Sequence, residues 1–278
     1  MIDAVAVDRN GAPVVDLRQD EMEVWIGHFL VPIDSFSAVT PASDDRNARL
    51  IVLVLDDMTL PLTELGRARD VARHFVTRML PGDRMAIVTL DGGSMETTGD
   101  RSRLLRAIDT YNVRATGVVR IDVLGEHVLK TMGAYARQLA EASEGRKIIV
   151  GIGSGWIFDR PIPPPAAGHD LLPEWVDAMR AMALANVTLY AIDPSGVGAR
   201  RVDGGDAGFA RATGGHAFVS TNDLNGAADR ILREASNYYM IGVMAPPVGR
   251  DADLRELDVR VKRRGVTVRA REAVSGGR

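Results

Sequence analysis

The chain of 278 residues contains no cysteine, and only 5% of its residues are aromatic. The absence of cysteine excludes disulfide bonds, thiol catalysis and cysteine-ligated zinc. It does not identify a compartment, because a cysteine-free chain is stable in either redox environment. With 46% hydrophobic residues the chain still has enough apolar mass to build a core, so a mainly disordered protein is excluded.

Long hydrophobic runs and an excess of one charge are also missing. No apolar run approaches the roughly 20 residues that a membrane-spanning helix needs, and the opening residues show no secretory signal pattern. The formal net charge is −3, from 34 basic and 37 acidic residues, which argues against a dedicated nucleic-acid-binding protein. The length suits one large α/β domain with a small companion.

The middle of the chain alternates apolar runs with helical patterns. Residues 49–55 read RLIVLVL, which is typical of a strand buried on both faces of a parallel sheet. Strands that alternate with helices predict βαβ units and a doubly wound, mostly parallel α/β sheet. We expect strands at Arg49–Leu55, Met85–Leu90, Lys147–Ile152, Val187–Ile192 and Ala217–Val219, and helices at Thr63–Leu80, Arg103–Tyr111, Ile121–Ala142, Leu171–Ala185 and Asp223–Ala235, the last capped by Thr221 or Asn222.

Both ends of the chain show a different pattern. Apolar residues precede a turn-forming segment at 8–11 and alternate again over 22–26, and residues 259–270 alternate valine with charge around an Arg-Arg-Gly turn. These patterns predict half-exposed antiparallel strands. We therefore expect an N-terminal β segment at 1–46, an α/β domain at 47–235, and C-terminal strands at 236–278 that complete one small antiparallel β unit with the first segment.

Ligand chemistry in doubly wound sheets lies outside the carboxyl ends of the strands. Asp56, Asp57 and Thr59 follow the first central strand, and their hard oxygen atoms suit Mg²⁺ or Ca²⁺. The structural alternative is a loop start, in which an aspartate accepts backbone N–H bonds and caps the next element. Asp193, after the fourth strand, either adds a carboxylate to this edge or belongs to a turn.

The segment 151–155 is rich in glycine and follows a predicted strand. A dinucleotide-binding loop needs G-x-G-x-x-G at the start of a helix. Here Trp156 stands at the last glycine position and a proline-rich stretch follows, so the pattern departs from that fingerprint. Ser154 is not in a G-x-S-x-G motif, and the five histidines show no metal-ligand spacing.

Several segments, taken in their order along the chain, carry a resemblance. They are AVDRNGAPVVDLRQDEMEV, which resembles a DxxGxPVxxLxxxDFxV pattern, then RLIVLVLDDMT, PGDRMAIVTL, GRKIIVGIGSG, ATGGHAF, EASNYYMIGVMAP and DVRVKRRGVTVRAREA. In this order they resemble the bacterial von Willebrand factor A-related proteins of the acidobacterial type, from the N-terminal β unit to the closing hairpin. The resemblance implies a von Willebrand A fold, in which helices wrap a central, mostly parallel sheet, and it suggests an exported or envelope-associated protein.

The resemblance also implies a metal-ion-dependent adhesion site, which binds protein partners. That site uses D-x-S-x-S after the first strand, a threonine from a later loop and an aspartate after the fourth strand. Asp56 matches the first ligand, whereas Met58 and Leu60 hold the two serine positions and offer no hard oxygen.

Few oxygen ligands therefore remain for an ion. Asp57, Thr59 and Thr116 are substitutes, and Ser154 stands where the family has an acidic residue. A divalent cation needs several oxygen ligands, usually more than one of them anionic. We expect no cofactor, or a weakly bound Mg²⁺, Ca²⁺ or Mn²⁺ ion, at a degenerate adhesion site.

The predicted function is a non-catalytic protein-binding module of the adhesion type with an unknown protein partner. Contact would run through the loops at 56–62, 91–99, 112–120 and 153–170, with Asp91, Ser154, Trp156 and Asp193 on the binding edge. One alternative is a magnesium-dependent phosphotransferase or hydrolase that uses Asp56, although phosphatases of this fold need a second aspartate where Met58 stands. A nucleotide-binding Rossmann domain is the other.

Overall fold

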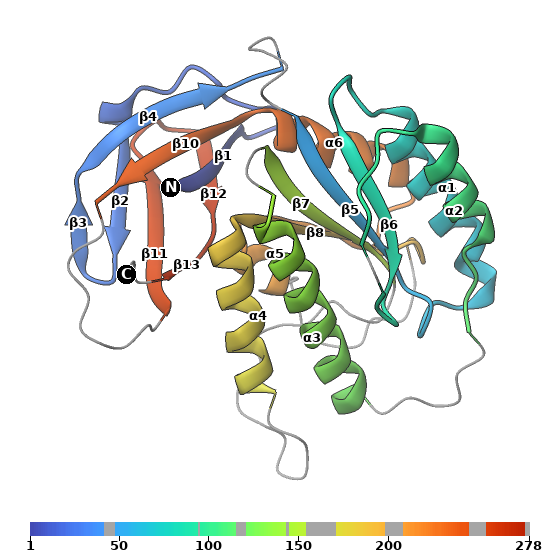
Figure 1. Ribbon diagram of the computed structural model, residues 1–278. Coiled ribbons are helices and arrows are strands. Elements are labelled where there is room, and N and C mark those ends of the chain that lie inside the picture. Colours follow the sequence, from blue (N-terminus) through green and yellow to red (C-terminus); the bar gives the residue numbers. More distant parts are fainter. Residues whose placement is uncertain are drawn as a thin grey trace.

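The centre of the computed structural model is a five-stranded parallel sheet with strand order β6-β5-β7-β8-β9 (Figure 1). The structure describes residues 1–41, 48–93, 95–114, 121–142, 145–153, 171–197, 208–244 and 254–275. This order places the first strand of the sheet between the second and the third, which confirms the predicted doubly wound α/β arrangement. The strands are β5 (Arg49–Leu55), β6 (Arg84–Thr89), β7 (Arg146–Ile152), β8 (Val187–Ile192) and β9 (Ala217–Phe218).

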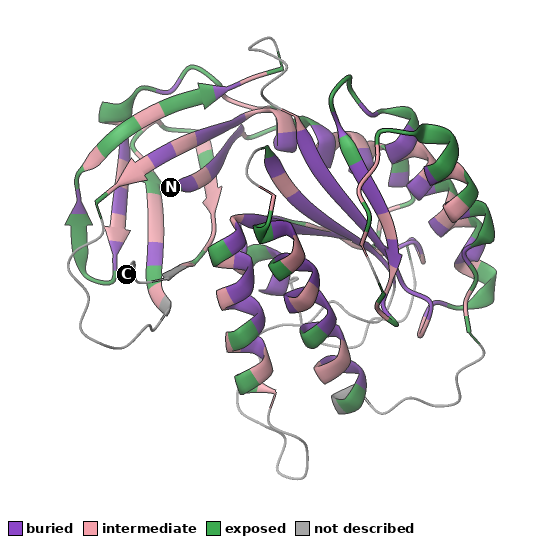
Figure 2. Cartoon of the chain, viewed as in Figure 1, coloured by how far each residue is buried: buried purple, intermediate pink, exposed green. Residues whose placement is uncertain are grey.

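Helices cover both faces of this sheet, and Figure 2 shows the central strands buried between them. Because successive residues of a strand point to opposite faces, β5 supplies Ile51, Leu53 and Leu55 to one core and the residues between them to the other. A run without alternation is therefore what a central strand requires. One face carries α1 (Leu65–Thr77), α2 (Arg101–Thr110) and α6 (Leu224–Ser236), and the other carries α3 (Ile121–Ala140), α4 (Leu172–Ala185) and α5 (Gly208–Ala212).

Two four-stranded antiparallel sheets, built from both ends of the chain, form a second part (Figure 1). Their strand orders are β12-β1-β10-β4 and β13-β11-β2-β3, and residues of both sheets share one apolar core. The predicted small antiparallel β unit is thereby confirmed. Its strands are β1 (Ile2–Asp8), β2 (Met22–Ile26), β3 (Phe29–Val31), β4 (Ile33–Val39), β10 (Tyr238–Val243), β11 (Leu254–Val261), β12 (Val266–Ala270) and β13 (Ala273–Ser275).

Buried ion pairs join the β unit to the α/β part. Arg146, the first residue of β7, pairs with Asp3 of β1, and the side-chain amide of Asn186 donates to the same carboxylate at 2.9 Å. Arg269 of β12 pairs with the buried Glu234 of α6 at 2.5 Å. Because a buried charge without a partner is expensive, these pairs fix how the two parts meet.

Some elements differ from the sequence-based expectation. The last helix begins at Leu224 and is capped by Asp223, whose carboxylate accepts from the N–H of Gly226 at 2.9 Å, so the predicted cap at Thr221 or Asn222 is wrong. Residues 62–64 form a 3₁₀ turn ahead of α1. No helix in the described part of the chain has the length and apolarity needed to span a membrane.

Candidate functional site at the carboxyl edge of the sheet

Asp56 begins the loop that leaves β5, and its carboxylate is used inside that loop. The side chain is fully buried. Its Oδ1 accepts from the backbone N–H groups of Met58 and Thr59 at 3.0 and 2.7 Å, and its Oδ2 accepts from the Thr59 hydroxyl. Burial raises the pKa of Asp56 above its ordinary value, against the opposing effect of these hydrogen bonds. The arrangement is that of a loop start closed by an aspartate.

Two apolar side chains stand beside this turn. Met58 packs against the core that α3 and α4 cover, and Leu60 is buried in the core that α1 and α2 cover. Neither Met58 nor Leu60 offers an oxygen to a divalent cation, and the Asp56 oxygens accept hydrogen bonds within their own loop. Among the described residues, no three His, Asp or Glu side chains gather as a metal-binding group.

Asp57 and Asp91 lie together at the ends of β5 and β6, with Arg114 across them. Asp57 is 2% exposed, and its Oδ1 accepts from the backbone N–H of Asp91 at 3.2 Å. The Arg114 guanidinium places Nε 3.3 Å from Asp57 Oδ2 and Nη2 2.8 Å from Asp91 Oδ2. The edge therefore carries a three-membered charge cluster with a cation supplied by the chain.

Tyr111 and Asp57 hold the loop that carries Arg114. The Tyr111 hydroxyl donates to the carbonyl of Asp56 at 2.6 Å, and the backbone N–H of Arg114 donates to the carbonyl of Asp57 at 2.8 Å. Burial raises the pKa of Tyr111 far above its ordinary value, so this hydroxyl stays a donor. Sequence reasoning placed the loop 112–120 at this edge but missed Arg114. The only signal for it was a basic residue in a loop facing several carboxylates.

The ends of β7 and β8 lie next along the same edge. The N–H of Gly153 donates to the carbonyl of Ile192 at 3.1 Å. Asp193 follows β8, and its carboxylate accepts from the N–H of Ser195 at 2.9 Å, which is the turn that the sequence allowed. Arg67 of α1 donates to the carbonyl of Ser195 at 3.2 Å and so joins this turn to the α1 side.

The predicted site residues are thus only partly placed by the structure. Asp56 and Thr59 are brought together by a direct hydrogen bond, and Asp57 is brought to Asp91. Thr116, Ser154 and Trp156 lie outside the described residues.

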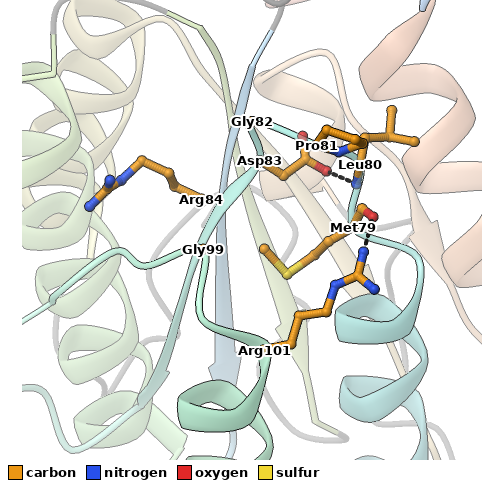
Figure 3. Close-up of a pocket in the computed structure, with 8 residues that line it drawn as sticks. All are labelled: Met79, Leu80, Pro81, Gly82, Asp83, Arg84, Gly99 and Arg101. Atoms are coloured by element: carbon orange, nitrogen blue, oxygen red, sulfur yellow. Dashed lines mark hydrogen bonds between the residues drawn. The ribbon is translucent and has the colours of Figure 1, made fainter.

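A cavity of about 400 Å³ lies at the opposite end of β6, where that strand begins (Figure 3). The polar side chains that line it already have partners within the chain. Asp83 accepts from the N–H of Leu80 at 2.7 Å and pairs with Arg49. Arg101 donates to the carbonyl of Met79 at 2.6 Å, as Figure 3 shows. We assign no ligand to this cavity.

Comparisons with known proteins give only distant likenesses to solved structures. No protein-family model matches the chain, and no curated protein matches it in sequence. Among solved structures, the chain is similar to the SpRpn10 VWA domain, with 15% identity, a TM-score of 0.42, and coverage of 66% of this chain and 94% of that one. It is also similar to the manganese-loaded Plasmodium vivax TRAP protein, with 10% identity, a TM-score of 0.39, and coverage of 86% of this chain and 96% of that one. The N-terminal domain of TFIIH p34 matches with 12% identity, a TM-score of 0.40, and coverage of 68% of this chain and 99% of that one. The fold class stated above rests on the strand order and the helix packing of this chain.

Proposed function

We propose that this chain is a non-catalytic protein-binding module of the von Willebrand A-related type, with a degenerate adhesion site that works without a bridging metal ion. One observation carries the proposal. The Asp56 carboxylate is buried and accepts three hydrogen bonds from its own loop, so neither of its oxygens is directed to a ligand.

Exposed side chains on the neighbouring loops supply a surface for a partner. Leu62, which follows the Asp56 loop, is 69% exposed, and Val197, which follows the turn after β8, is 66% exposed. Arg67 lies between the two loops, because it pairs with Glu64 on one side and binds the Ser195 carbonyl on the other. Asp91 adds a carboxylate with a 45% exposed side chain. An apolar centre with a polar rim is typical of protein interfaces.

The enzymatic alternative requires Asp56 as a nucleophile or a magnesium ligand. Both roles need a carboxylate oxygen that a substrate or an ion reaches. A fully buried Asp56 with apolar Met58 and Leu60 beside it favours the binding module over this alternative.

A ligand screen on the purified chain separates the candidates. A ligand that binds only the folded state raises the melting temperature, so the screen would use Mg²⁺, Mn²⁺, Ca²⁺, NAD(H) and ATP. We expect no saturable shift with any of them. A saturable shift with a nucleotide, or turnover of a phosphate ester, would overturn the proposal.

Partner contact is tested by site-specific photo-crosslinking in extracts of the source cell. A photoreactive phenylalanine analogue replaces Leu62 or Val197 at the edge, and Phe29 of β3, which is 68% exposed on the β unit, is the matched control. We expect the two edge positions to capture the same protein with and without EDTA, and the control position not to capture it. Capture that EDTA abolishes, or equal capture at the control position, would contradict an ion-free binding edge.

A further inference from the structure

A guanidinium stands between the two carboxylates at the ends of β5 and β6. Arg114 contacts Asp57 through Nε and Asp91 through Nη2, at 3.3 and 2.8 Å. One rigid, planar group therefore spans both carboxylates, which lie just beyond the ends of two adjacent strands of the sheet. Arginine suits this role because its donors are fixed in a fork and it remains protonated at all relevant pH values.

The position of this guanidinium is built into the fold. The N–H of Arg114 donates to the Asp57 carbonyl at 2.8 Å, and the adjacent Tyr111 is anchored on the Asp56 carbonyl at 2.6 Å. Asp57 is almost completely buried, whereas the Arg114 side chain is 59% exposed. The buried carboxylate is thus paired with a positive charge that reaches it from the solvent side.

Arg114 thereby offsets part of the negative charge at the edge that the fold offers for ligands, without a ligand. Asp56 is closed in its own turn, so Asp57 and Asp91 are the carboxylates left near this point. We propose that Arg114 takes the place of a divalent cation at the edge: its guanidinium occupies the space between Asp57 and Asp91 and keeps Mg²⁺, Mn²⁺ and Ca²⁺ away from them. This inference concerns the chain without a partner and does not rest on the proposed function.

The inference is tested with Mn²⁺ as the probe, by the loss of the free Mn²⁺ signal in electron paramagnetic resonance. For the wild-type chain we expect no saturable binding up to about 10 mM Mn²⁺. This concentration is above the dissociation constants of about 10⁻⁴–10⁻³ M that weak extracellular calcium sites show. In Arg114→Gln the two carboxylates lose their counter-charge, and we expect one Mn²⁺ to bind at least roughly tenfold more tightly than to the wild type. Adding Asp91→Asn to that variant should remove the gain.

Two control variants isolate the effect. Arg114→Lys keeps a positive charge beside the carboxylates and should gain no Mn²⁺ affinity. Arg103→Gln removes an arginine of α2 from its exposed pair with Glu96. It changes the net charge as much as Arg114→Gln does, and it should bind Mn²⁺ like the wild type. Circular dichroism checks that each variant is folded, and Arg114→Ala replaces Arg114→Gln if the latter is not.

The outcomes are decisive in both directions. Saturable binding of one Mn²⁺ to the wild-type chain, or a folded Arg114→Gln or Arg114→Ala variant with wild-type Mn²⁺ binding, would overturn the inference. Failure of the edge to capture a partner would overturn the proposed function and leave this inference standing.

Discussion

The hydroxyl of Tyr111 donates to the backbone carbonyl of Asp56 across 2.6 Å. Tyr111 directly follows α2, and Asp56 begins the loop after β5, so this bond joins two segments that are 55 residues apart in the chain. It ties the loop with Arg114 to the strand end where the carboxylates lie. The geometry of the candidate site therefore depends on a tyrosine that acts through the Asp56 backbone.

Replacing Tyr111 by phenylalanine should destabilise the chain. The change leaves the buried Asp56 carbonyl without its donor, which costs about 1–3 kcal/mol. Tyr190→Phe is the comparison, because the buried Tyr190 hydroxyl lies near the Glu234 carboxylate but makes no well-formed hydrogen bond among the described residues, and it should cost less than Tyr111→Phe. The free energy of unfolding in urea measures both. Equal losses in the two variants would show that the Asp56 bond is not what Tyr111 contributes.

Substitutions of Asp56 distinguish a turn-forming aspartate from a ligand. Asp56→Asn keeps an oxygen for the N–H groups of Met58 and Thr59 and removes the cost of burying a carboxylate. We expect its free energy of unfolding at pH 7 to equal or exceed that of the wild type. Asp56→Ala leaves both N–H groups unpaired and should cost about 1–3 kcal/mol.

Partner capture should survive Asp56→Asn, whereas a metal-dependent site would lose it, because an amide is a poor replacement for an anionic ligand.

Much of the fold was predictable because hydrophobic patterns fix it. The run at Arg49–Leu55 has no alternation, and the strand it forms is covered on both faces. The strand β4 (Ile33–Val39) was missed, since its sequence IDSFSAV mixes polar and apolar residues and its pairing with β10 depends on a partner about 200 residues away. The cap of α6 was predicted one or two residues too early, because Thr221, Asn222 and Asp223 are all good cap residues.

The candidate site was predictable only in part. The sequence placed Asp56 and Asp57 at a strand end, which follows from the strand pattern alone. The sequence offered a loop-closing Asp56 and a cation-binding Asp56 as alternatives, and the structure shows the first, which depends on backbone geometry. The sequence did not indicate that Arg114 meets Asp57 and Asp91, since that contact depends on how the end of α2 docks on the sheet.

The buried pair of Arg49 and Asp83 should be one of the most costly polar contacts to break in the α/β part. Their side chains are 3% and 2% exposed, and Arg49 also donates to the Leu232 carbonyl at 3.1 Å and to Ser236 Oγ at 2.9 Å. Asp83→Ala leaves a buried guanidinium without its counter-charge, which costs about 3–5 kcal/mol. The free energy of unfolding in urea should fall by that amount.

A double-mutant cycle tests whether the pair acts as a unit. Arg49→Met with Asp83→Ala should cost less than the sum of the two single changes, because the double variant buries no lone charge. The exposed pair of Arg103 and Glu96, whose side chains are 52% and 68% exposed, is the comparison, and breaking it should cost at most about 1 kcal/mol. Additive losses at Arg49 and Asp83 would mean that the two residues act separately.

Acid should weaken a contact within the β unit in a defined pH range. Arg263, in the turn between β11 and β12, donates to the two carboxylate oxygens of Glu21 at 2.8 and 2.7 Å. These hydrogen bonds lower the pKa of Glu21 from its ordinary 4.5 to about 2. A lowered pKa in the folded state means that the contribution to stability is fully present above about pH 4.5 and is lost as the pH falls toward 2.

The Glu21→Gln variant should therefore be less stable than the wild type at pH 6, and the difference should shrink steadily between pH 4.5 and 2. Urea unfolding midpoints at half-unit steps of pH measure this convergence. Glu96→Gln is the control, because the pKa of Glu96 is also lowered by its arginine partner while its side chain is 68% exposed, and solvent screening should make its difference smaller. A Glu21→Gln deficit that stays constant down to pH 2 would show that the carboxylate charge is not what stabilises this contact, since only a charge-dependent contribution titrates away with the proton.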